Sequence, residues 1–355
     1  MQIRIMLIIL ALFLFAAPLT AQDMSNVRAT ADLSAIKEFA LDNATQMHTA
    51  TQAYLATIQS YYDLLASHDF DYVSAWEADN ETLVRLISDA RAQWLDASVH
   101  YETNEGIIAG VPSLSYYDVW IDAGASASED PQNALDWQLK LPNGDILQSP
   151  GNFFHYITEP ALWGTHPDFV GLAVDLNGDG EIKSSEMLPE ANILLSGAQG
   201  LDSATAELVD AVNSWQPTIE DAFTAMVIMV PTMSGYFEEW KQSAYIEGDV
   251  AERENFVAVS RLFDINGILT GLNVTYDRVS AVVAETDADL DAQIDTGFSN
   301  LLDYVNNLYS QEQSGVRFSP EEADFFGSEA QHRAENLVAL LAQAADELGL
   351  QLELK

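Results

Sequence analysis

Apolar residues recur at helical spacing over most of the chain. From residue 33 onward they return at intervals of three, four or seven, as on one face of an α-helix. The first such face consists of Met47, Tyr54, Ile58, Tyr61 and Leu65. After a break at 68–70 the pattern resumes through Leu83, Leu86, Ala90 and Trp94. The spacing therefore predicts two long antiparallel helices at the start of the mature chain.

The segment 106–200 departs from this pattern, because Gly, Pro and Asn separate its short apolar runs. Within it, Asn143-Gly144 lies between two alternating runs. That arrangement is typical of a β-hairpin with a type I′ turn. Helical spacing returns after residue 202. We therefore expect an all-α protein of two antiparallel helical bundles, with a small β-hairpin and a loop-rich calcium-binding insertion between them.

The insertion is expected to bind calcium because residues Asp175–Glu186 match the twelve-residue EF-hand loop position by position. Gly180 occupies the sharp bend, and Lys183 stands at position nine, where a water supplies the ligand. We predict one calcium ion with a structural role. Its expected ligands are the side chains of Asp175, Asn177 and Asp179, the backbone carbonyl of Glu181 and both carboxylate oxygens of Glu186.

The first residues resemble an export signal. Arg4 precedes an unbroken apolar run at 6–15, and small residues follow at Ala16, Ala17 and Ala21. This predicts a signal peptide and a periplasmic or extracellular location. The run is shorter than the about 20 residues that span a bilayer, and we expect no integral membrane segment in the mature chain. The predicted domains are a signal peptide at 1–21, a first helical bundle with hairpin and calcium loop at 22–200, and a second helical bundle at 201–355.

Composition restricts the partners of the chain. Its 14 Lys and Arg residues face 55 Asp and Glu residues, for a formal net charge of −41. This charge repels nucleic acids, which we exclude as partners, and it can concentrate cations. There is no cysteine, which excludes disulfides, thiolate metal sites and a lipid-anchor cysteine.

Four motifs follow one another along the chain. They are Tyr101-Glu102-Thr103-Asn104-Glu105, a stretch with Asp118 and Ile121-Asp122, a stretch with His155, Glu159 and Ala161-Leu162-Trp163, and Ser260–Gly271. In this order they resemble the imelysin-like family, catalogued as peptidase M75. Closest is its branch of periplasmic iron-uptake proteins, EfeO and EfeM. One departure concerns spacing: the family has HxxE, whereas His155 and Glu159 are four apart.

The resemblance implies two pseudo-symmetric helical bundles and a metal site, with iron handed on to a membrane permease. The residue types agree, because carboxylate pairs at helical spacing plus a histidine form a mixed N/O set that suits iron, zinc or manganese. Alternatively, the carboxylates cap helices or face solvent, and His155 is a hydrogen-bonded core residue. The candidate ligands of this second metal are Glu102, Glu105, Asp118, Asp122, His155 and Glu159.

Three functions remain open. The leading one is an extracytoplasmic metal-binding protein of the imelysin type, which captures iron for uptake and holds calcium structurally. The second is a calcium-stabilised surface module that binds polysaccharide or protein through the hairpin and the loop-rich middle. The third is an M75-like metallopeptidase, in which Glu159 or Glu105 acts as base. The chain has neither an HExxH pair nor a nucleophile elbow, which argues against an enzyme.

Overall fold

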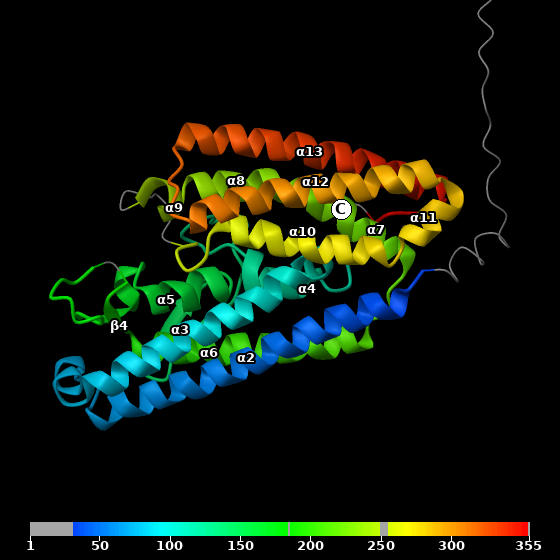
Figure 1. The fold of residues 1–355 in the computed structure, drawn as a ribbon. Helices are drawn as coiled ribbons and strands as arrows, with labels where there is room; N and C mark the ends of the chain where they lie inside the picture. Colours follow the sequence, from blue (N-terminus) through cyan, green and yellow to red (C-terminus); the bar gives the residue numbers. More distant parts are fainter. Residues whose placement is uncertain (1–30, 184, 249–254, 354–355) are drawn as a thin grey trace, which may run out of the picture.

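The computed structural model describes residues 31–183, 185–248 and 255–353. The predicted signal peptide at 1–21 lies outside them. Helices dominate these residues, and the strands among them form two short antiparallel hairpins, so the predicted all-α fold with a small hairpin is confirmed. The helices form two stacked groups (Figure 1).

Three long helices build the first group. Helices α2 (Leu33–Ser67) and α3 (Tyr72–Gly110) run antiparallel, as predicted, and α6 (Ala191–Ser214) packs along α2 (Figure 1). The turn between α2 and α3 ends at Asp71, whose carboxylate accepts from the backbone N–H groups of Val73 and Ser74 and caps α3. The predicted apolar face of α2 is buried throughout. The predicted domain boundary between residues 200 and 201 falls inside α6.

Short elements connect α3 to α6 and carry most of the candidate ligands. They are α4 (Ser115–Asp118), a π turn η1 (Val119–Ala123), strands β1 (Gln138–Lys140) and β2 (Ile146–Gln148), a second π turn η2 (Phe154–Thr158), α5 (Glu159–Trp163), a 3₁₀ turn η3 (Pro167–Phe169), and strands β3 (Val170–Ala173) and β4 (Met187–Pro189).

The hairpin β1–β2 forms where the sequence predicted it, but its turn differs. Gln138 pairs with Gln148 and Lys140 with Ile146. Of the two turn residues, Gly144 alone has a positive φ, of 94°, whereas a type I′ turn requires positive φ at both. Pro142 explains the difference, because its fixed negative φ favours a three-residue loop that closes with one left-handed glycine.

The second group contains the remaining helices. They are α7 (Ile219–Met229), a 3₁₀ turn η4 (Val230–Thr232), α8 (Met233–Lys241), α9 (Ala244–Glu247), α10 (Arg261–Asp277), α11 (Ser280–Thr286), α12 (Ala288–Gln313) and α13 (Pro320–Glu347). Helix α13 packs against α8 and α12, and α10 packs against both α12 and α3. Helix α10 therefore joins the two groups, which share one continuous apolar core.

Candidate metal centre

The centre lies where α10 crosses α3. A Cβ atom on Gly267 of α10 would stand 2.8 Å from the Cβ of Glu102, and one on Gly271 would stand 2.1 Å from the carbonyl oxygen of Thr103. Only glycine permits so close an approach of two helix backbones. As a result, Glu102 and Glu105, which point from α3 toward this crossing, are 1% and 2% exposed.

Two π turns supply further candidate ligands. The turn η1 carries Asp122, and the turn η2 carries His155 and leads directly into Glu159 of α5. A π turn is one residue wider than an α-helical turn, since its hydrogen bonds run from i to i+5. His155 and Glu159 are four apart yet their side chains meet, with 2.9 Å between Nδ1 and Oε2. The π turn thus accommodates the one residue by which the spacing between His155 and Glu159 exceeds the spacing in the HxxE motif.

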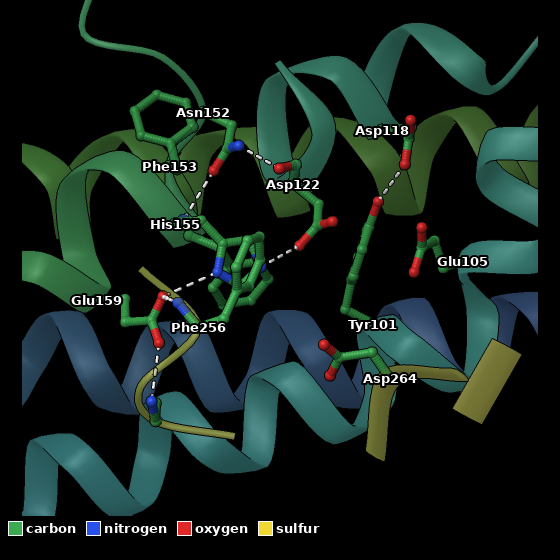
Figure 2. A network of polar contacts seen from close by, with 12 residues as sticks. Tyr101, Glu105, Asp118, Asp122, Asn152, Phe153, His155, Glu159, Phe256 and Asp264 are labelled. Atoms are coloured by element: carbon green, nitrogen blue, oxygen red, sulfur yellow. Dashed lines mark hydrogen bonds and ion pairs between the residues drawn. The ribbon is translucent and has the colours of Figure 1, made fainter. Parts of the chain in front are cut away.

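His155 lies between two carboxylates (Figure 2). Its Nε2 is 2.8 Å from Oδ1 of Asp122, and its Nδ1 is bonded to Glu159. Asn152 fixes the surroundings, because its side chain accepts from the backbone N–H of His155 and donates to the carbonyl oxygens of Asp122 and Gly124. Burial disfavours the charged imidazole, but Asp122 and Glu159 outweigh it and raise the pKa of His155 to about 10.

Glu159 connects the two groups of helices. Its carboxylate accepts from the backbone N–H groups of Phe256, Val257 and Ala258 at 3.0, 2.8 and 2.8 Å, in addition to its contact with His155. Both oxygens are therefore occupied, and the side chain is fully buried. The geometry makes Glu159 a residue that positions His155 and the segment before α10.

The centre is rich in buried carboxylates. Among the described residues, six acidic side chains are buried here: Glu102, Glu105, Asp118, Asp122, Glu159 and Asp264. Figure 2 shows most of them around Tyr101. The hydroxyl of Tyr101 donates to Asp118 at 2.6 Å, and that of Tyr236 donates to Glu105 at 2.5 Å.

Among the described residues, Arg261 is the other buried cation of the centre. Its guanidinium donates to Glu239 at 2.7 Å and to Asp264 at 2.5 Å. It also lies over the rings of Phe256 and Tyr236, at 3.9 and 4.3 Å from their centroids. Arg261 thus offsets part of the negative charge and is itself enclosed by aromatic rings.

The remaining charge is incompletely compensated. Burial raises the pKa of Asp118 to about 7, and it raises the pKa of Asp264 to about 6 although Arg261 opposes it. Burial and neighbouring carboxylates, chiefly Asp264 and Asp122 respectively, raise the pKa values of Glu102 and Glu105. One oxygen on each of Glu102, Glu105 and Asp264 is buried without a hydrogen-bond partner. Buried carboxylate oxygens that lack a hydrogen-bond donor are suitable ligands for a cation.

Three residues already have the spacing of a metal site. Ligand atoms of Glu102, Asp122 and His155 lie within 4.8 Å of one another. A cavity of about 700 Å³ reaches one member of this trio, Asp122, and Tyr236, Arg261, Glu129 and Asp130 also line it. The structure thus brings together five of the six sequence candidates around a mixed N/O set, and it gives the sixth, Glu159, a positioning role.

The predicted calcium loop lies between β3 and β4, which form a hairpin that the sequence analysis missed. Oxygens of Asp175, Asp179 and Glu186 lie within 4.8 Å of one another. Backbone N–H groups hold them, from Gly178 and Gly180 to Asp175 and from Lys183 to Glu186. Asn177 and Asp179 also contact each other, and the ammonium of Lys183 pairs with Asp179.

The fold and this centre define a helical-bundle protein with a buried carboxylate–histidine cluster between its two groups of helices. A family model described as Imelysin, or peptidase M75, matches residues 38–348, and the chain belongs to the imelysin family. None of the curated proteins matches the chain. In the part of the chain that the structure describes, no helix has both the length and the apolar character needed to cross a membrane. The narrower assignment to the EfeO/EfeM branch stays a prediction.

Proposed function

We propose that this imelysin-family protein captures a transition-metal cation outside the cytoplasm, with iron as its cargo in the manner of EfeO and EfeM. The observation that carries the proposal is the convergence of Glu102, Asp122 and His155 beside buried carboxylate oxygens that accept no hydrogen bond. Nitrogen and oxygen donors in this combination suit iron, manganese and zinc. Export would follow from the predicted signal peptide, and a membrane permease would receive the ion.

The cavity beside Asp122 is suited to a hydrated cation. Glu129, Asp130 and Glu239 line the cavity, and the charge of the whole chain attracts cations toward it. Arg261, the one arginine among the described residues of the wall, is already paired with two carboxylates. A metal held in an anionic chelate would be repelled here, so the chelator must leave before the ion enters.

Loss of one ligand is expected to abolish capture. Asp122→Asn should lower the affinity for Fe²⁺ or Mn²⁺ by about 100-fold or more, because loss of a residue that only orients a ligand already costs 10–100-fold. Isothermal titration calorimetry of the calcium-loaded chain measures this. Glu312→Gln is the matched control, since Glu312 is also buried, with one oxygen bonded to Trp240 and the other unpartnered, but lies outside the centre. Equal affinity in wild type and Asp122→Asn would refute the proposal.

The metallopeptidase alternative gains no support from the geometry. A base must reach the water that a metal activates, and Glu159 has both oxygens engaged by backbone N–H groups and His155. Glu105, the other predicted base, keeps Oε2 without a partner, so the alternative stays a prediction that rests on Glu105.

We propose in addition that the loop Asp175–Glu186 holds a structural calcium ion. Calcium at about 100 times its dissociation constant should raise the free energy of unfolding by about 2.7 kcal/mol, and EDTA should remove that gain. Glu186→Gln should lose the calcium response, whereas Glu181→Gln should keep it, because Glu181 is an exposed residue that contributes its backbone carbonyl. Thermal unfolding with and without calcium gives the comparison, and an unaltered response in Glu186→Gln would contradict the assignment.

A further inference from the structure

We propose that the centre holds two cations. The first position is the trio of Glu102, Asp122 and His155, and the second lies between Glu102, Glu105 and Asp264, with Glu102 shared by both. This inference rests on the proposed function, since it concerns the capacity of the same centre. It begins from three buried oxygens, one on each residue of the second set, that accept no hydrogen bond.

The three residues of the second set are neighbours. Glu102 and Glu105 are three apart on α3, so they share a helix face. The strongest charge interaction of Glu102 is with Asp264, which α10 brings to the same place. All three side chains are at most 2% exposed, so they lie below the surface of the molecule.

Two carboxylates of the second set, Glu105 and Asp264, accept hydrogen bonds from residues that do not belong to the set. Tyr236 donates to Oε1 of Glu105 and leaves Oε2 without a partner. Arg261 donates to Oδ2 of Asp264 and leaves Oδ1 without a partner. Proteins commonly orient a metal-binding carboxylate in this way: a donor from the surrounding residues fixes one oxygen, and the other oxygen stays available to the metal. Neither Tyr236 nor Arg261 belongs to the trio of the first position. The carboxylates that they orient, Glu105 and Asp264, therefore indicate a second cation position.

Formal charge is consistent with this. If all six buried carboxyl groups of the centre give up their protons when metal binds, two divalent cations leave less buried negative charge than one, and Arg261 is already shared between Asp264 and Glu239. Carboxylate-bridged metal pairs are typically about 3.5–4 Å apart. The first set is the tighter one, and a second ion would draw Glu105 and Asp264 toward Glu102.

The test uses Mn²⁺, with excess calcium present to keep the calcium loop filled. Equilibrium dialysis of the full chain is expected to give two Mn²⁺ per chain, and electron paramagnetic resonance is expected to show an exchange-coupled pair. Glu105→Gln should reduce the stoichiometry to one and restore the spectrum of an isolated ion. Glu312→Gln, the buried control outside the centre, should bind two coupled ions like wild type.

Each result decides between the proposals. One isolated Mn²⁺ in wild type, unchanged by Glu105→Gln, would overturn the second position and leave the capture function intact. No Mn²⁺ in wild type would overturn both. The wild-type stoichiometry and spectrum suffice to decide, so the test does not depend on the folding of Glu105→Gln.

Discussion

The metal-free protein is expected to lose stability as the pH rises from 5 to 9. The pKa values of Asp118 and Asp264 rise on folding from 3.8 to about 7 and about 6, and that of His155 rises from 6.5 to about 10. In each case the folded chain binds the proton more tightly than the unfolded chain. Stability from these groups is therefore complete at low pH and is lost as the pH passes each folded-state pKa. Together they should cost on the order of several kcal/mol over this range.

The measurement is urea unfolding at several pH values in the presence of EDTA. Saturating Mn²⁺ should flatten or reverse the trend, because the ion takes the place of the protons and binds more tightly as the carboxyls ionise. The lowered pKa of Asp122 acts in the opposite direction, but only below 3.8, outside the range measured. Stability that rises with pH in the metal-free protein would show that the buried carboxyls are not the dominant groups.

Replacement of Arg261 by methionine is expected to destabilise the chain by about 3–5 kcal/mol. The side chain is 5% exposed, and its removal leaves the carboxylate of Asp264 buried without its counter-charge. Contacts with the rings of Phe256 and Tyr236 are lost at the same time. Differential scanning calorimetry of the metal-free protein at pH 8, where Asp264 is ionised, should show a fall in Tm of roughly 4–8 °C.

Arg333→Met provides the matched control. Arg333 also pairs with a carboxylate, Glu329 at 2.8 Å, and lies over an aromatic ring, Tyr304 at 4.6 Å, but its side chain is 36% exposed. Exposed pairs contribute about 0–1 kcal/mol, so the control should lower Tm by no more than about 2 °C. Equal losses in the two variants would mean that burial of the Arg261 pair carries no special weight.

Local spacing was enough to predict much of this molecule. The periodicity of α2, the Asn143-Gly144 hairpin and the convergence of Asp175, Asp179 and Glu186 in one loop each depend on residues close in sequence. The same holds for Glu102 and Glu105 on one helix face. These features could be predicted because a helix face, a tight turn or a loop repeats the same geometry wherever it occurs.

The rest of the centre depends on contacts between distant segments. Nothing local indicates that Arg261 and Asp264 meet Glu102, because the crossing of α3 and α10 depends on glycines more than 150 positions away from Glu102. The π turns are equally hidden, since π and α segments have no distinct apolar spacing over five residues. For the same reason, only the structure reveals that three backbone N–H groups from 256–258 occupy Glu159.

The chain has no cysteine and therefore no covalent cross-link between its segments. The centre draws Glu102 from α3, Asp122 and His155 from the π turns, and Asp264 from α10. An ion bound there would act as a reversible cross-link between these segments in the middle of the molecule. Metal binding and the packing of α10 against α3 would then be coupled, so the metal-loaded chain would be more rigid than the metal-free chain. A receptor that separates α10 from α3 would release the ion by the same movement.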